Sequence, residues 1–288
     1  MNQQFANAEE YHASPLAGSS MLEDFRESRR YFADRYVFRC IDPPAPTPDM
    51  VLGTLFHIAV LEPETWLDRV APPYPDLAPD GKKWLRRKGS QHERWWAEEV
   101  EERRGLIACT QDQVATVREM TKALWRNPMA KILLERDGVA EHAIVWNDPE
   151  TGVPCKCLVD WFADISIDLK TCPSATPQSF SRSIATFGYH RKAAHYLAGL
   201  KAHTGEDRKL LHVAIGKAVP HSCAVYEIRA SDLELGSKQR RETLIALAKC
   251  YDSGDWSEPH EREIITLGLP GWAYSEDSYL LGESINGE

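Results

Sequence analysis

The spacing of hydrophobic and polar residues divides the chain into helical stretches, strand-forming stretches and polar breaks. In the first 140 residues, apolar periodicity and capping residues predict helices over residues 19–36, 47–62, 91–104, 110–127 and 129–136. Alternating apolar and polar positions predict strands at 141–146, two within 153–171, 210–216 and 223–229, with helices over 177–187, 189–200 and 231–253. This order predicts an α/β domain whose mixed central sheet is flanked by helices.

Several predicted helices begin at residues that can cap their first turn. Thr47 can accept a backbone hydrogen bond, Pro48 suits the first helical position, and Asp49 complements the helix dipole. The other N-terminal signals are Ser19 or Ser20, Thr110 with Gln113, and Ser231 with Glu234. Gly188 interrupts the helical pattern after residue 187, so two helices are expected there.

The chain of 288 residues is long enough for one large domain or two small ones. A Pro-Pro-Ala-Pro run at residues 43–46 breaks the chain and separates an N-terminal helical extension, residues 1–46, from the rest. We predict a single domain over residues 47–272 and a polar C-terminal tail over residues 273–288. No internal repeat is apparent in the sequence.

Candidate chemistry lies in the two strands predicted within residues 153–171. Asp168 and Lys170 are two apart on one strand, so they share a face while Leu169 points into the core. A bend near residues 163–164 can bring Asp160 beside them. Paired carboxylates suit Mg²⁺ or Mn²⁺, and a lysine beside them can orient water or stabilise charge on a phosphate. The alternative is a solvated Asp-x-Lys pair without catalytic meaning.

One histidine lies in an otherwise apolar helix. Gly53 and His57 are four residues apart, so they share a helical face, and glycine allows another backbone to approach closely. His57 is either a core histidine with a satisfied partner or a metal ligand. The residues alone leave both interpretations open.

Composition narrows the class of protein without identifying its chemistry. A hydrophobic content of 43% and a charged content of 27% are ordinary for a globular protein in water. No run approaches the ~18 apolar residues that a membrane span needs. The polar, acidic N-terminus lacks the pattern of a signal peptide. We therefore expect a cytoplasmic protein.

The net charge of −9 disfavours nucleic-acid binding, because phosphate contacts need Lys and Arg. Local charge distribution matters more than the total. The two basic clusters are Lys82, Lys83, Arg86, Arg87 and Lys88, and Arg182, His190, Arg191 and Lys192. Each cluster is a candidate nucleic-acid contact, with a solvated helix face as the alternative.

The seven cysteines are scattered and odd in number, which argues against a disulfide framework. Cys155 and Cys157 lie one residue apart, without the spacing of a zinc or iron–sulfur motif. We expect buried free thiols at these positions.

Five stretches follow one another in the order found in a known nuclease superfamily. They are Tyr11-His12, residues 52–64 (LGTLFHIAVLEPE), 150–161 (ETGVPCKCLVDW), 168–171 (DLKT) and 188–197 (GYHRKAAHYL). These stretches resemble the PD-(D/E)xK nuclease superfamily, in its RecB-type branch, and most closely the exonuclease VIII (RecE) nuclease domain. The resemblance extends from residue 11 to residue 272, nearly the whole chain.

The resemblance implies a restriction-endonuclease-like core with the order αβββαβ, which agrees with the elements predicted independently. It implies that Asp160, Asp168 and Lys170 are catalytic. The implied metal ligands are His57, Asp160, Asp168 and the backbone carbonyl of Leu169, with Mg²⁺ as cofactor and Mn²⁺ as an alternative. The residues implied on the DNA side are Tyr189, His190, Arg191, Lys192 and Tyr196.

The implied activity is that of a metal-dependent deoxyribonuclease, in particular an exonuclease that acts on double-stranded DNA ends in phage or prophage recombination. The implied partner is a single-strand annealing protein, and the implied assembly is a ring-like homo-oligomer. Two rivals stay open: a repair endonuclease of the same superfamily, and a catalytically silent DNA-binding or scaffolding protein. The family helix usually has Gln-x-x-x-Tyr, whereas Lys192 precedes Tyr196 here. That lysine either adds a phosphate contact or marks an altered site.

Overall fold

The computed structural model describes residues 5, 8–75, 77–84 and 88–270. A five-stranded sheet in the order β1-β2-β3-β4-β5 forms its centre, so the strands keep their order in the chain. They are β1 (Val139–Asn147), β2 (Pro154–Phe162), β3 (Ile165–Cys172), β4 (Lys209–Gly216) and β5 (Cys223–Tyr226). β3 and β4 pair in parallel, and the other neighbours are antiparallel. The predicted mixed sheet is therefore confirmed.

Two helices, α9 (Pro177–Thr186) and α10 (Tyr189–Thr204), connect the parallel strands β3 and β4. A parallel pair needs a long crossover of this kind, because the chain must return to the start of the sheet. Gly188 separates the two helices with a φ of 63°, a left-handed conformation that glycine adopts without steric cost. The interruption predicted at this glycine is confirmed.

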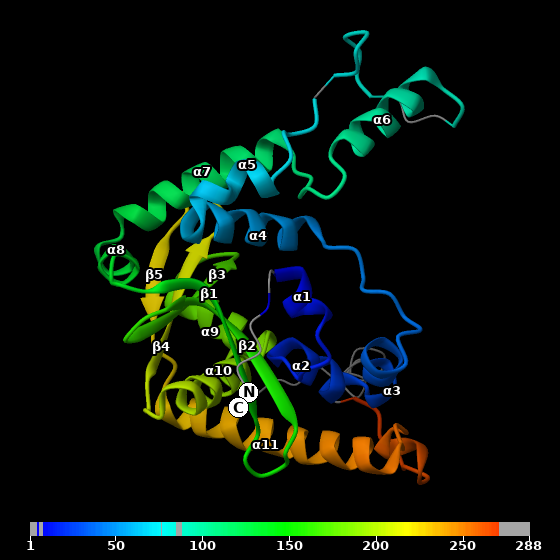
Figure 1. The fold of residues 1–288 in the computed structure, drawn as a ribbon, viewed down its shortest axis with the longest axis vertical. Helices are drawn as coiled ribbons and strands as arrows, with labels where there is room; N and C mark the ends of the chain where they lie inside the picture. The colour runs from blue at the N-terminus through cyan, green and yellow to red at the C-terminus, as the bar shows by residue number, and fades with distance from the viewer. Residues whose placement is uncertain (1–4, 6–7, 76, 85–87, 271–288) are drawn as a thin grey trace, which may run out of the picture.

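Helices cover both faces of the sheet (Figure 1). On one face lie α4 (Pro48–Leu61), α7 (Gln111–Arg126) and α8 (Pro128–Leu134). Their buried side chains, with Leu55, Phe56 and Met120 among them, pack against Ile167 and Leu169 of β3. The order α4, β1, β2, β3, α10, β4 matches the αβββαβ core.

The opposite face is covered by α10, α2 (Ser19–Glu27) and the long α11 (Ala230–Ser253). The buried side chains of this layer include Phe25, Leu200 and Leu247, which pack with Ile144 and Val159 of the sheet. The N-terminal helix α2 therefore shares a core with the sheet. The domain boundaries stay predictions.

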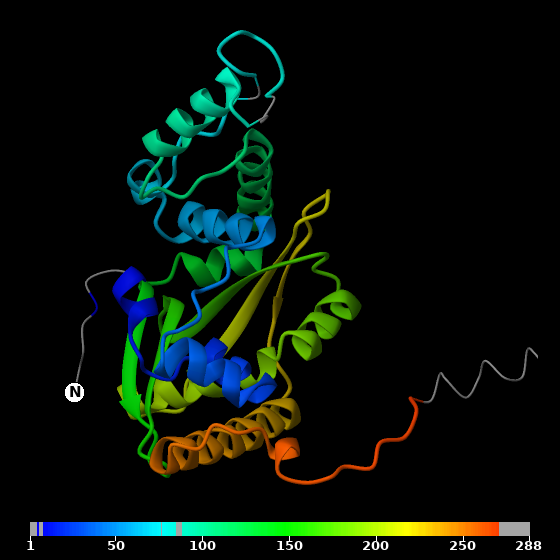
Figure 2. The same cartoon turned by 90° about the vertical axis from the view of Figure 1, so that its right-hand side faces the viewer.

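The other helical segments are α1 (Ala8–Ala13), α3 (Arg29–Phe32), a π-helical turn (Ala33–Val37), a 3-10 turn (Pro63–Thr65), α5 (Trp66–Arg69), α6 (Gln91–Glu102) and a 3-10 turn (Pro259–Glu261). α6 and its flanking loops project away from the layer that contains α4 and α7 (Figure 2). Within the described residues, every helix is too short or too polar to cross a membrane.

Local capping signals placed two helix starts correctly. The Thr47 hydroxyl accepts the N–H of Met50 and Pro48 is the first residue of α4. Thr110 and Gln113 form the predicted reciprocal capping box at the start of α7. In both cases the cap and its partner are three residues apart, so the sequence contains the whole signal.

The prediction of one helix over residues 19–36 is wrong, because the chain breaks at Ser28. Ser28 is extended, with φ −155° and ψ 121°, and its hydroxyl accepts the N–H of Tyr31 to start α3. The same hydroxyl donates to Glu258 at 2.6 Å. α2 itself starts after Gly18, which has no side chain to cap it, and Ser19 and Ser20 are its first residues.

The capping box predicted at Ser231 and Glu234 is also wrong. α11 begins at Ala230 after Arg229, without a side-chain cap, so Ser231 already lies inside the first turn. The predicted end of this helix is confirmed by Gly254, whose φ is 68°. The last strand stops at Tyr226 rather than residue 229. The predicted tail, residues 273–288, lies outside the described residues.

Candidate functional site

The hairpin of β2 and β3 positions the acidic and basic residues that the sequence singles out. It turns at residues 163–164, as predicted, and pairs Trp161 with Ile167. Leu169 is fully buried, which turns its neighbours Asp168 and Lys170 to the other face of the strand. Asp160 Oδ2 accepts the N–H of Leu169 at 2.6 Å, so this carboxylate lies directly beside β3.

Asp168 and Lys170 form a close pair. Lys170 Nζ donates to Asp168 Oδ1 at 2.6 Å and to the Leu169 carbonyl at 3.1 Å. The second carboxylate oxygen of Asp168 lies 3.4 Å from Nε2 of His212, a buried residue directly across the parallel β3–β4 pair. Sequence reasoning missed His212. The length of the crossover between two parallel strands does not determine which residue of β4 lies opposite Asp168 on β3.

A second group of ligand-type side chains lies next to this pair. His57 of α4, Glu141 of β1 and Asp160 of β2 place their ligand atoms within 4.8 Å of one another. His57 Nδ1 is 3.8 Å from both carboxylates, and its Nε2 is 3.2 Å from the Leu169 carbonyl. We call His57, Glu141 and Asp160 the cation cluster. Among the predicted metal ligands, the structure therefore brings together His57, Asp160 and the Leu169 carbonyl, while Asp168 contacts Lys170 and His212.

Glu141 belongs to the cation cluster although sequence reasoning did not identify it. The pairs Ala140–Trp161 and His142–Val159 place it directly opposite Asp160 in the antiparallel ladder. Two carboxylates at opposed positions repel each other, and Glu141 also has a φ of 48°, which is unusual for a residue with a side chain. The sequence does contain a signal for this pairing. Counting outward along both strands from the turn at residues 147–152 places Glu141 opposite Asp160.

The local charges shift the ionisation of these groups. Burial, reinforced by the nearby Asp168 carboxylate, raises the pKa of Asp160 to about 6. Burial also opposes ionisation of Asp168, but Lys170 and His212 outweigh it and lower the pKa of that carboxyl. Burial disfavours the cationic form of His57, yet Asp160 and Glu141 outweigh it and raise its pKa. The cation cluster therefore has an excess of negative charge that a bound cation would relieve.

The donor set of the cation cluster fits a divalent metal ion. The two carboxylates supply hard oxygen atoms, which Mg²⁺ and Mn²⁺ prefer, while the Leu169 carbonyl accepts hydrogen bonds from His57 Nε2 and Lys170 Nζ. The imidazole of His57 adds a nitrogen, a donor that is more usual for Mn²⁺ than for Mg²⁺. A bound cation would also reduce the repulsion between Glu141 and Asp160, which favours binding.

A cavity of about 110 Å³ opens beside the Asp168–Lys170 pair. Among its lining residues are three of the predicted DNA-side residues, Tyr189, Lys192 and Tyr196. The Lys170 ammonium lies 5.6 Å from the centre of the Tyr189 ring, a distance at which the ring attracts a cation. These three predicted positions therefore lie together with the candidate catalytic lysine.

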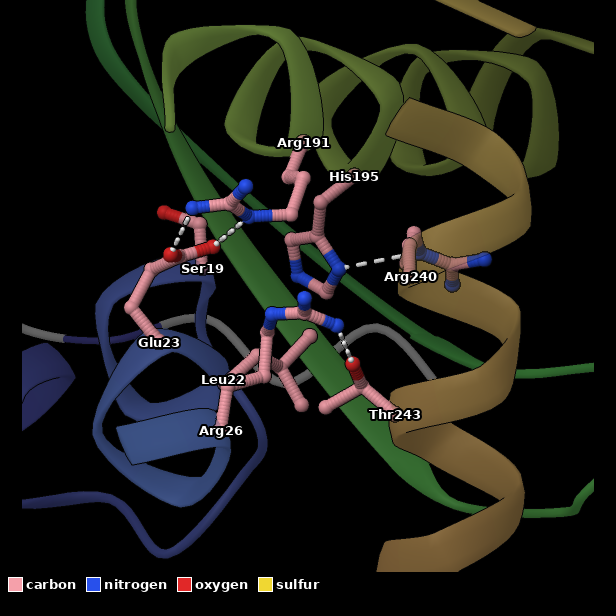
Figure 3. Close-up of a pocket in the computed structure, with 8 residues that line it drawn as sticks. All are labelled: Ser19, Leu22, Glu23, Arg26, Arg191, His195, Arg240 and Thr243. Carbon is pink, nitrogen blue, oxygen red and sulfur yellow. Dashed lines mark hydrogen bonds and ion pairs between the residues drawn. The ribbon is translucent and has the colours of Figure 1, made fainter. Parts of the chain in front are cut away.

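The remaining two predicted DNA-side residues contact protein instead. Arg191 forms a bidentate pair with Glu23 of α2, at 2.8 and 2.5 Å, and His190 contacts Gln239 of α11 at 3.0 Å. Figure 3 shows Arg191 turned toward Glu23 at the junction of α2, α10 and α11. Their predicted contact with DNA stays a prediction.

The same junction contains a buried histidine that holds α10 to the sheet and to α11 (Figure 3). Arg240 Nε donates to His195 Nδ1 at 3.1 Å, so His195 Nε2 is the protonated nitrogen and donates to the Lys156 carbonyl at 3.0 Å. Burial, with Arg240 adding to it, lowers the pKa of His195 to about 3. The imidazole is therefore neutral in the folded protein.

Acid should destabilise the protein through His195. Unfolded histidine binds a proton near pH 6.5 whereas folded His195 does so near pH 3, so the free energy of unfolding falls as pH drops below about 6.5, by up to about 1.4 kcal/mol per pH unit. Urea unfolding at pH 7.5, 6.5 and 5.5 measures this slope. His195→Gln should have the smaller slope, and equal slopes in the two proteins would contradict the assignment.

Within the first basic cluster, Lys82, Lys83 and Lys88 are exposed around the loop before α6, and Arg86 and Arg87 lie outside the described residues. Cys155 and Cys157 are buried free thiols, as predicted. Burial raises the pKa of the Cys155 thiol to about 12, which makes a thiolate ligand unfavourable there.

The sheet, its crossover and the Asp160–Asp168–Lys170 geometry define a PD-(D/E)xK nuclease fold. The chain belongs to the family DUF3799, described as a PDDEXK-like domain of unknown function, which matches residues 18–263. A crystal structure of a "Putative exonuclease" from Eubacterium rectale has a TM-score of 0.60 with this chain at 12% sequence identity, over 96% of this chain and 99% of the other. That likeness shows the fold alone. No curated protein gives a significant match.

Proposed function

We propose that this protein is a divalent-metal-dependent deoxyribonuclease that digests double-stranded DNA from its ends. The observation that carries the proposal is the position of the Asp168–Lys170 pair directly beside the cation cluster. Carboxylates alone would support only a cation site. A buried lysine next to them adds the positive charge that phosphodiester hydrolysis needs.

A divalent cation held by the cation cluster would activate water and neutralise charge on the phosphate. Lys170 has three N–H donors, and two are used by Asp168 and the Leu169 carbonyl. The third can hold a water molecule or donate to a phosphate oxygen as negative charge develops there. Burial opposes the charge on Lys170, but Asp168 and Asp160 outweigh it and raise the pKa of the ammonium, so it stays protonated.

The preference for DNA ends rests on sequence resemblance to the RecE nuclease domain. The name of the Eubacterium rectale protein, an exonuclease, is consistent with it. A single-strand annealing protein as partner, a recombination setting and a ring-like homo-oligomer are proposals from the same resemblance. Mg²⁺ is the proposed cofactor, with Mn²⁺ as the alternative that the imidazole ligand favours.

Linear and closed-circular duplexes of the same sequence test the proposed mode of cleavage. With Mg²⁺ the linear duplex should lose nucleotides from its ends, while the closed circle stays intact because it offers none. Comparable cleavage of the circle would favour the endonuclease alternative. Failure to cut either substrate, with Mg²⁺ and with Mn²⁺, would favour the silent DNA-binding or scaffolding alternative.

A further inference from the structure

Two histidines from distant parts of the chain meet at the C-terminal end of α10. His142 of β1 and His203 in the last turn of α10 are 61 residues apart in the sequence, and their Nε2 atoms lie 3.4 Å apart. His203 is exposed and His142 is half-buried, so the space beside the two nitrogen atoms is open to solvent. Two ligand-type nitrogen atoms therefore face each other at the surface of the protein.

The distance between the two nitrogen atoms suits a shared metal ion better than a hydrogen bond. Hydrogen-bonded N–H donors commonly lie about 2.7–3.2 Å from their acceptors, so a separation of 3.4 Å is long for this bond. Zinc binds histidine nitrogen at about 2.0–2.1 Å, and tetrahedral geometry then places two such nitrogen atoms about 3.3–3.4 Å apart. The protein holds the two imidazoles at the separation that a tetrahedral zinc ion requires.

Phe162 of β2 orients both imidazole rings. The His142 ring stacks on the Phe162 ring with their centres 4.4 Å apart and an interplanar angle of 23°. The His203 ring meets the same phenyl ring edge-on, at 5.6 Å and 75°. Ligand side chains that packing already holds in place lose less conformational entropy when a metal binds. The histidine pair is therefore preorganised.

The charges around the histidine pair are compatible with a bound cation. His203 lies in the last turn of α10, where the negative end of the helix dipole favours positive charge. Arg208 is an opposing charge, because its guanidinium lies 5.3 Å from the centre of the Phe162 ring. This guanidinium donates to the Ala163 carbonyl at 3.0 Å and lies 3.6 Å from the Glu206 carboxylate, which balances part of its charge.

We propose that His142 and His203 bind a Zn²⁺ ion through their Nε2 atoms, with water in its remaining positions. The ion fastens the C-terminal end of α10 to β1. Imidazole nitrogen suits zinc, whereas Mg²⁺ takes oxygen ligands. The site is separate from the cation cluster, in which Glu141 and Asp160 face His57 of α4. The zinc site does not depend on the proposed nuclease function.

Calorimetric titration of the full-length protein with Zn²⁺ tests the site. His203→Gln should fold, because His203 is exposed at a helix end and glutamine is a good helix former. This variant should lose one zinc equivalent or bind it at least about 10-fold more weakly, since even a residue that only supports a metal ligand contributes this much. His142→Gln should show the same loss. Zinc titrations of both variants that match the wild-type titration would overturn the site.

Two further variants identify which histidines hold the zinc. His57→Ala removes a ligand of the cation cluster, which can also bind zinc, and should keep the equivalent that His203→Gln loses. His260→Gln changes an exposed histidine in the 3-10 turn Pro259–Glu261 and should titrate as the wild-type protein does. If His57→Ala loses the same equivalent, the ion lies in the cation cluster. If His260→Gln loses it equally, zinc binds adventitiously to surface histidines. Either result would overturn the proposed site.

Thermal unfolding measures the effect of the ion on the fold. A ligand that binds only the folded protein raises its stability, and a metal that joins residues far apart in the chain closes a long loop. Zinc should therefore raise the unfolding temperature of His57→Ala, and this rise should disappear when His203→Gln is added to it. A rise that persists in the double variant would contradict the proposal. Neither measurement uses DNA, so the result is independent of whether the protein is a nuclease.

Discussion

Lys170→Met is expected to lower the rate of DNA cleavage by at least about 10²-fold. A loss of this size is typical when an enzyme loses one hydrogen-bond donor that stabilises the negative charge of the transition state. Methionine keeps the unbranched stem and removes the ammonium that Asp168 holds at 2.6 Å. Asp168→Asn should reduce the rate to a similar extent, because a neutral amide no longer holds the lysine by charge. Single-turnover digestion of end-labelled duplex measures the rate of each variant.

Folding must be checked for both variants by circular dichroism, because Asp168 and Lys170 are largely buried. Lys209→Met is the matched control, since this lysine is exposed on the neighbouring strand and pairs with Glu227 at the surface. It should cleave at the wild-type rate. Near-normal rates in folded Lys170→Met and Asp168→Asn proteins would refute the assignment of the pair.

Glu141→Gln is expected to weaken divalent-metal binding by at least about 10-fold. Even mutation of a residue that only hydrogen-bonds to a metal ligand commonly causes a loss of this size. The same change should raise the thermal stability of the metal-free protein, because it removes the repulsion between Glu141 and Asp160 across the β1–β2 pair. Calorimetric titration with Mn²⁺ and thermal unfolding in chelator measure the two effects. Weaker metal binding together with higher stability of the metal-free protein identifies Glu141 as a metal ligand, whereas loss of a structural carboxylate would lower the stability.

Glu150→Gln serves as the control, because Glu150 lies in the turn between β1 and β2 and pairs with Arg241 at the surface. This variant should bind Mn²⁺ as the wild-type protein does. His57→Ala should weaken Mn²⁺ binding more than it lowers stability. If Glu141→Gln binds metal normally, or if His57→Ala loses stability with unchanged metal binding, the cation cluster is not the metal site.

The parts of the fold that the sequence predicts well depend on residues close together in the chain. Thr47 with Pro48, and Thr110 with Gln113, contain complete helix-start signals within four residues. The turn at residues 163–164 and the alternation around Asp168 likewise determine which side chains share a strand face. Asp160 and the Asp168–Lys170 pair were predicted for this reason, although the contact between Lys170 and Asp168 required the structure.

The parts that the sequence does not predict depend on contacts between distant residues. The break at Ser28 is stabilised by Glu258, and the pairing of His212 with Asp168 depends on the α9–α10 crossover. Arg191 is drawn away from the cavity by Glu23 on the N-terminal helix, which no local pattern indicates. The resemblance predicted the superfamily, but it could not supply Glu141.

Metal-dependent digestion of end-labelled linear duplex DNA tests the central claim most directly. Purified protein is incubated with the duplex in Mg²⁺, in Mn²⁺ and in chelator, beside the Lys170→Met variant. We predict progressive loss of nucleotides from the ends with either metal, none in chelator, and at least about 10²-fold slower loss in the variant. Digestion that persists in chelator, or that proceeds equally in the folded variant, would contradict the account.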